Sequence, residues 1–171
     1  MLSYSTDRGQ TFSTPAPVSL ASDRSAYSAP AISPDGRSVY VTYMAYSRPF
    51  QTTTANPRPE HGVLRMATIG ANGTPGPWAT LYDGPFGDAR GTSQGRILYN
   101  EFLGDYVYAI ATRTYGMGVW TDTRRTADCP AMDAWRQASF DAGHLVFPAP
   151  WPLGDCPASF GNNDIFGATT G

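Results

Sequence analysis

Charged side chains that could bind or activate a substrate are gathered in four predicted loops, at residues 19–27, 47–62, 83–105 and 121–133. Arginines in such loops can hold an anionic group through paired hydrogen bonds, and carboxylates can exchange protons with it. Loops are polar in most proteins, so the same residues also fit a purely structural role. The set comprises Asp23, Arg24, Arg48, Arg58, Glu60, His61, Asp88, Arg90, Glu101, Asp105, Tyr106, Asp122, Arg124 and Asp128.

Short strands must position these loops. Ser33-Pro34-Asp35-Gly36 is a turn sequence, because proline presets the second position and Asp-Gly tolerates left-handed geometry. Residues 39–46 alternate with period two and are apolar on both faces, which predicts a strand covered on both sides. Residues 63–69 and 78–82 are predicted strands, with a turn at 70–77 between them.

A second unit of the same kind begins near residue 105. It has one strand, a predicted turn at Tyr115-Gly116-Met117-Gly118, and a further strand through Asp122. We expect about three strands between residue 105 and Phe140, and a last edge strand at 164–166.

These units predict an all-β chain of four-stranded antiparallel modules, which is typical of a partial β-propeller. The expected divisions are the end of one blade at 1–20, a full blade at 25–83, most of a last blade at 104–140 and a closing segment at 141–171. About two and a half blades result, whereas a closed ring needs about four to eight. We therefore expect the rest of the propeller to be missing from this chain.

Composition excludes several classes of protein. The net charge is −2, and all 12 basic residues are arginine, so there is no basic field for nucleic acid. Neither a spanning apolar segment nor a signal peptide is expected. His61, His144, Cys129 and Cys156 lack zinc-ligand spacing, so no metal site of that kind is predicted. The two cysteines could form a disulfide or remain separate thiols.

Residues 5–12 carry a compact motif, Ser-Thr-Asp-Arg-Gly-Gln-Thr-Phe. Ser5 and Asp7 can bond the backbone of their own turn, Gly9 supplies a positive φ, and Thr11 can close the far side. Phe12 is expected to anchor the turn on the sheet. The motif predicts a tight hairpin with a structural role.

The motif resembles the Asp box of the BNR-repeat proteins, which include the sialidases. The resemblance implies a propeller in which the Asp box joins the third and fourth strands of a blade. Sialidase chemistry implies an arginine for the sugar carboxylate and a tyrosine nucleophile activated by a carboxylate. Tyr106 and Glu101 are the candidates for the catalytic pair, and Arg124, Asp122 and Asp105 for substrate binding.

A second resemblance lies in the C-terminal third. Phe102 to Tyr106, Val119 to Arg124, Asp128 to Ala134 and Cys156 to Gly167 are similar to the last blade of secreted bacterial sialidase-like propellers. The likeness implies export, which in turn favours a Cys129–Cys156 disulfide. It implies a glycan or glycoprotein as partner.

Two functions remain open at this stage. The first is the C-terminal part of a secreted exo-glycosidase that hydrolyses terminal sialic acid or a similar sugar only in the full-length protein. The second is a non-catalytic extracellular propeller that binds glycan or protein. Asp105 and Asp122 could also hold calcium, although capping of loop amides is the favoured role for both. No other cofactor is predicted.

Overall fold

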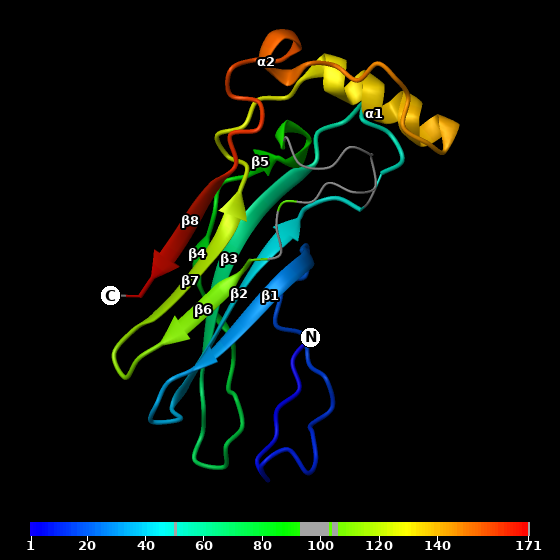
Figure 1. Ribbon diagram of the computed structural model, residues 1–171. Helices are drawn as coiled ribbons and strands as arrows, with labels where there is room; N and C mark the ends of the chain where they lie inside the picture. Colours follow the sequence, from blue (N-terminus) through cyan, green and yellow to red (C-terminus); the bar gives the residue numbers. More distant parts are fainter. Residues whose placement is uncertain (50, 93–102, 104–105, 171) are drawn as a thin grey trace.

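The computed structural model describes residues 1–49, 51–92, 103 and 106–170, and consists mainly of two antiparallel sheets (Figure 1). This confirms the predicted class. The first sheet has the order β1 (Arg24–Ile32), β2 (Ser38–Tyr46), β3 (Pro59–Thr68) and β4 (Ala79–Asp83), with β5 (Gly87–Asp88) paired to the start of β3. The second has the order β6 (Tyr108–Ala111), β7 (Gly116–Asp122) and β8 (Asp164–Thr169). A 3₁₀ turn at Ala89–Gly91 and the helices α1 (Pro130–Ala142) and α2 (Pro152–Asp155) complete the described elements.

The first sheet forms where alternation predicts it. Val39 to Ala45 are all buried, because β2 is covered on both faces. The β1–β2 turn is held as expected: the Ser33 hydroxyl donates to Asp35 Oδ1 at 2.6 Å, and the Arg37 amide donates to the same oxygen at 3.2 Å. The β1–β2 hairpin therefore follows from the local sequence.

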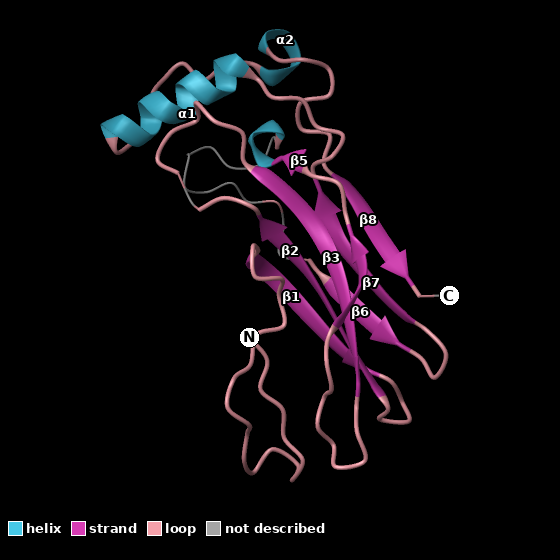
Figure 2. Ribbon diagram, turned by 180° about the vertical axis from the view of Figure 1, so that it is seen from behind, coloured by secondary structure: helices cyan, strands magenta, loops and turns pink. Residues whose placement is uncertain are grey.

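The two sheets pack face to face, with β6 against β1 and β7 against β2 (Figure 2). Glycines allow this close approach. A Cβ on Gly116 would overlap the Tyr40 ring, and one on Gly62 would overlap the Trp120 indole. Trp120 is fully buried between the sheets.

Corresponding strands of the two sheets run in the same direction. The arrowheads of β1 and β6 point one way in Figure 1, and those of β2 and β7 point the opposite way. Since neighbouring strands are antiparallel, β3 and β8 also run alike. The second sheet thus repeats the first three strands of the first sheet. Among the described strands, neither sheet closes on itself.

The Asp-box hairpin has the predicted internal bonds. Asp7 accepts from the Thr11 amide at 2.9 Å and the Thr11 hydroxyl at 2.6 Å, and the Ser5 hydroxyl accepts from the Gly9 amide at 2.8 Å. Gly9 has φ 83°. The prediction for Phe12 is wrong, because its side chain is 66% exposed and points away from any core. Local hydrogen bonds alone hold the turn.

This hairpin lies beside the turn that joins β3 to β4 (Figure 1). A Cβ on Gly73, in that turn, would come within 2.9 Å of the Thr6 methyl group. Further along, Leu2 and Val18 pack against Val41 on the outer face of the first sheet. Residues 1–20 therefore cover part of the face that the second sheet leaves open.

The substitution Asp7→Ala should loosen this turn without affecting the sheets. Hydrogen bonds from Thr11, first from its hydroxyl, hold the pKa of Asp7 at about 2, so the carboxylate accepts bonds at all ordinary pH values. We expect faster amide hydrogen exchange at Thr11 and Gly9 in the variant, and unchanged exchange in β2. Asp35→Ala is the matched control and should accelerate exchange at Arg37 instead. Unchanged exchange at Thr11 would contradict this role.

Residues 130–142 form helix α1, not the strand expected before Phe140. Cys129 is the N-cap, Pro130 occupies the first turn, and Gly143 ends the helix at φ 70°. Buried positions recur with helical spacing at Met132, Trp135, Arg136 and Ser139. Arg136 and Ser139 are polar, so the apolar pattern of the sequence shows only part of this helical spacing.

The second sheet differs from prediction in its turn and its third strand. The β6–β7 turn is at Thr112 to Tyr115, where the Thr112 amide donates to the Tyr115 carbonyl at 2.8 Å. Gly116 and Gly118 lie inside β7, because the packed first sheet leaves no room for side chains there. The third strand is β8, the predicted edge segment, which returns to β7 after the helices.

A disulfide joins Cys129 to Cys156, as the resemblance implies. It links the start of α1 to the residue after α2. The two cysteines are 27 positions apart, so removing the bond should lower the free energy of unfolding by about 3–4 kcal/mol on the chain-entropy model. Urea denaturation of the Cys129→Ser/Cys156→Ser variant measures this loss. A reductant should destabilise the native protein equally and leave the variant unchanged; equal stability of both proteins would refute the prediction.

Candidate functional site

The predicted site residues that the structure describes lie mainly at one end of the sheets. β1 starts, β2 ends, β3 starts and β7 ends there, and α1 and α2 cover it (Figure 1). We call this the loop end. Glu60 and His61 lie within β3 and not in the loop predicted at 47–62. Glu101 and Asp105 lie outside the described residues.

Asp122 and Arg124 bind each other at the loop end. Asp122 is fully buried and accepts from the Arg124 backbone amide and Nε, both at 2.8 Å, and from Trp120 Nε1 at 3.0 Å. Burial alone would raise the pKa of Asp122, but the bonds from Arg124 outweigh it and lower the pKa. The hydrogen bond to Asp122 raises the pKa of Arg124 further above its ordinary value. The favoured role for Asp122, capping its strand by bonding a loop amide, is therefore observed.

The guanidinium of Arg124 has further neighbours. Its Nη1 donates to the Tyr82 hydroxyl at 3.1 Å, and its Cζ lies 4.0 Å from the centre of the Phe166 ring. Tyr82 and Phe166 come from different sheets, so Arg124 links the sheets at this end. Its donors are therefore engaged within the protein, which leaves little capacity for a sugar carboxylate.

Tyr106 stands apart from this pair, just before β6. Its side chain is 66% exposed, whereas the next residue, Val107, is buried. The Tyr106 side chain is therefore accessible to a ligand in this structure. Its predicted partner Glu101 lies outside the described residues.

Glu60 is one of the two glutamates of the chain, and its carboxyl group is buried. Its Oε2 accepts from the Thr123 hydroxyl at 3.0 Å, and its Oε1 has no hydrogen-bond partner among the described residues. Burial, followed by the negative charge of Asp122, raises the pKa of Glu60 to about 8. Glu60 is thus a protonated acid at neutral pH. Its burial depends on contact between β3 and the end of β7, which local sequence does not reveal.

A second network lies on the outer face of the first sheet. His61 Nδ1 is 2.8 Å from Asp83 Oδ1, and its Nε2 is 3.5 Å from Asp23 Oδ1. The Tyr43 hydroxyl donates to Asp23 at 2.7 Å, and burial raises the pKa of Tyr43. Phe86 packs on the imidazole with ring centres 4.3 Å apart. Nδ1 is held by Asp83, whereas Nε2 has no hydrogen-bond partner among the described residues, so His61 lies between the end of β4 and the residue before β1.

A third network fastens α1 to the sheets. Arg90 contacts Asp88 at 2.8 Å, Asp128 at 3.1 Å and Asp133 at 3.2 Å. Arg136 donates to the Arg90 carbonyl at 2.7 Å. Burial, followed by a hydrogen bond with Asp128, raises the pKa of Asp133 to about 7 against the opposing effect of the two arginines. These loop charges therefore serve a structural role.

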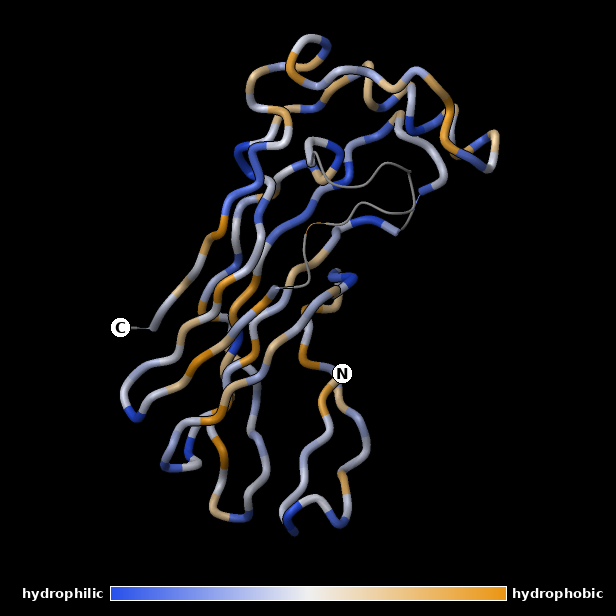
Figure 3. The backbone as a smooth tube through the Cα atoms, viewed as in Figure 1, coloured by the Kyte–Doolittle hydropathy of each residue, from blue (hydrophilic) through white to orange (hydrophobic). Residues whose placement is uncertain are grey.

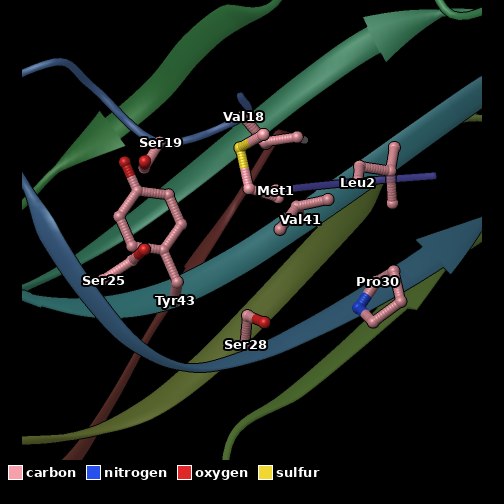
Figure 4. A pocket seen from close by; sticks show the side chains of 9 residues that line it. All are labelled: Met1, Leu2, Val18, Ser19, Ser25, Ser28, Pro30, Val41 and Tyr43. Carbon is pink, nitrogen blue, oxygen red and sulfur yellow. The ribbon is translucent and has the colours of Figure 1, made fainter. Parts of the chain in front are cut away.

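A cavity of about 180 Å³ opens on the outer face of the first sheet, beside residues 1–20 (Figure 4). The Tyr43 ring forms one wall, and its hydroxyl lies next to Ser19 in the close-up view. Among the described residues, no arginine or carboxylate lines it. Its lining residues are Met1, Leu2, Val18, Ser19, Ser25, Ser28, Pro30, Val41 and Tyr43.

Within the part of the chain that the structure describes, no three His, Cys, Asp or Glu side chains are grouped to hold a metal ion. No described helix is long and apolar enough to cross a membrane. Comparison with protein-family models, with curated proteins and with solved structures found no match for this chain.

Proposed function

We propose that this chain forms consecutive blades of an exported, sialidase-like β-propeller of the Asp-box type. One observation carries the proposal: the second sheet repeats the strand order and direction of the first sheet. β6 packs on β1, and β7 packs on β2. Blades of a propeller are radial repeats of this kind. The Asp-box hairpin supports it, since it lies beside the β3–β4 turn of the next module.

The cavity also fits this proposal. Residues 1–20 would be the outer strands of a preceding blade, and the cavity lies where that blade's inner strands would pack on β1 and β2. The missing contacts would be supplied by the rest of the propeller. The cavity is then an unfilled blade interface and not a ligand site.

For the activity, we propose that hydrolysis of terminal sialic acid or a similar sugar belongs to the full-length protein, with this chain supplying its scaffold. The arginine nominated for the sugar carboxylate is engaged by Asp122 and Tyr82. Tyr106 is exposed, so its side chain could contact a glycan. The second candidate is a non-catalytic propeller that binds glycan or protein, and the closed Asp122–Arg124 pair favours it.

Incubation of purified 1–171 with a fluorogenic sialic acid glycoside tests the scaffold role. We expect no release above the uncatalysed rate, and the same result for Tyr106→Phe. Release that Tyr106→Phe abolishes would overturn the scaffold role and assign hydrolysis to this chain. Binding of sialyllactose without release, weakened by Tyr106→Ala, would favour the non-catalytic candidate.

A further inference from the structure

An exposed apolar segment lies at the end of the molecule farthest from the Asp-box hairpin (Figure 1). Residues 145–154 read Leu-Val-Phe-Pro-Ala-Pro-Trp-Pro-Leu-Gly, without a charged, hydroxyl or amide side chain. Three of its side chains face solvent: Phe147 is 77% exposed, Trp151 66% and Leu153 86%. Figure 3 shows hydrophobic colouring in this end segment as well as along the strands. We call residues 145–154 the apolar tip.

The apolar tip is anchored to the protein at both ends. Leu145 and Val146 pack against the core that contains Cys129 and Trp135, and Trp135 Nε1 donates to the Val146 carbonyl at 2.6 Å. At the other end, the Trp151 amide donates to Asp155 at 2.7 Å, and the disulfide follows at Cys156. Anchoring at both ends lowers the conformational entropy that the segment loses on binding.

The charge around the apolar tip limits its partner. No arginine occurs between Arg136 and the C-terminus, and the acidic residues Asp141 and Asp155 flank the tip. The segment itself therefore offers no cation to an anionic phosphate. A sugar site needs polar groups that converge on the hydroxyls, and the tip has no such side chains. Tryptophan, phenylalanine and leucine without nearby cations suit the interfacial zone of an uncharged lipid surface.

We propose that the apolar tip inserts Phe147, Trp151 and Leu153 into the interface of a zwitterionic lipid bilayer, as a peripheral and reversible attachment. This inference does not depend on the proposed function. Attachment through the tip would hold the loop end of the sheets near the lipid headgroups, because α1, α2 and the tip share that end (Figure 2).

Co-sedimentation of 1–171 with phosphatidylcholine vesicles tests the attachment. We expect vesicle binding, a blue shift of tryptophan emission from Trp151, and little effect of salt. Leu153→Asp and Phe147→Asp should each lower the partition coefficient at least tenfold. Ile165→Asp is the matched control: Ile165 is 67% exposed but lies on β8, so this variant should bind like the unchanged protein. Unchanged circular dichroism excludes unfolding in any variant.

Several outcomes would overturn the inference. One is the absence of binding at any lipid concentration. Another is an equal loss in Leu153→Asp and Ile165→Asp, which would indicate nonspecific adhesion. Binding only to vesicles with phosphatidylserine, abolished by salt, would place the contact on the arginines instead. Quenching of Trp151 by free sugars, without vesicle binding, would identify the tip as a glycan platform.

Discussion

Trp120→Ala is expected to lower the free energy of unfolding by about 3–5 kcal/mol, the range for loss of a large buried aromatic side chain. Trp120 has no exposed surface and fills the space between the two sheets, where its ring lies 5.6 Å from that of Tyr82. Its indole nitrogen also donates to Asp122, which would lose a hydrogen bond while remaining buried. Urea denaturation followed by circular dichroism measures the loss.

Gly62 supplies a stringent test of the same contact. In the unchanged protein Gly62→Ala should cost about 1–3 kcal/mol, because the new methyl group overlaps the Trp120 ring. In the Trp120→Ala background the methyl group has room, and the same change should cost little. Gly154→Ala is the matched control, since its Cβ would also meet a tryptophan, Trp151, but that ring is exposed and can move. Additive costs at Gly62 and Trp120 would contradict the contact.

The elements that the sequence predicts correctly are those whose pattern is local. β2 alternates over nine residues, and the turns at Ser33 and Asp7 carry their own hydrogen-bonding side chains. Such features need no knowledge of the rest of the chain. The propeller itself remains a proposal, because two stacked sheets without a closed ring define only the class.

The errors arise where distant segments decide the structure. Gly116 and Gly118 have the composition of a turn, yet they belong to β7 because Tyr40 and Thr42 of the other sheet lie against them. The third strand of the second sheet comes from residues 164–169, beyond two helices. Neither fact follows from a local window.

The candidate site shows the same division. The sequence alone places Asp122 and Arg124 at the same strand end, but it does not reveal that their side chains form hydrogen bonds with each other. His61 is predicted in a loop but lies in β3. Asp23 accepts a hydrogen bond from the Tyr43 hydroxyl and lies beside His61, so both side chains take part in internal contacts. The least predictable residue is Glu60, whose environment depends on Thr123 of the second sheet.

Glu60→Gln should therefore stabilise the protein at pH 8 and leave its stability nearly unchanged at pH 4. The pKa of Glu60 is about 8 in the folded state, whereas its ordinary value is 4.5. Between these pH values the folded protein retains a proton that the unfolded chain has released. The contribution of protonated Glu60 to the free energy of unfolding is thus fully present below pH 4.5. It is lost as the pH rises through 8, by up to about 1.4 kcal/mol per pH unit. Glutamine carries no charge at any pH and removes this loss.

The measurement is the free energy of unfolding of both proteins at intervals from pH 4 to pH 8. The difference between them should start near zero and widen steadily, because only the unchanged protein must bury a carboxylate beside Asp122. Asp133→Asn is the control for a second raised carboxyl: burial and the neighbouring Asp128 raise the pKa of Asp133, so its difference should also widen as the pH rises. Parallel curves for Glu60→Gln and the unchanged protein would mean that water reaches Glu60. The contact between β3 and the end of β7 would then be looser than the buried Thr123–Glu60 hydrogen bond requires.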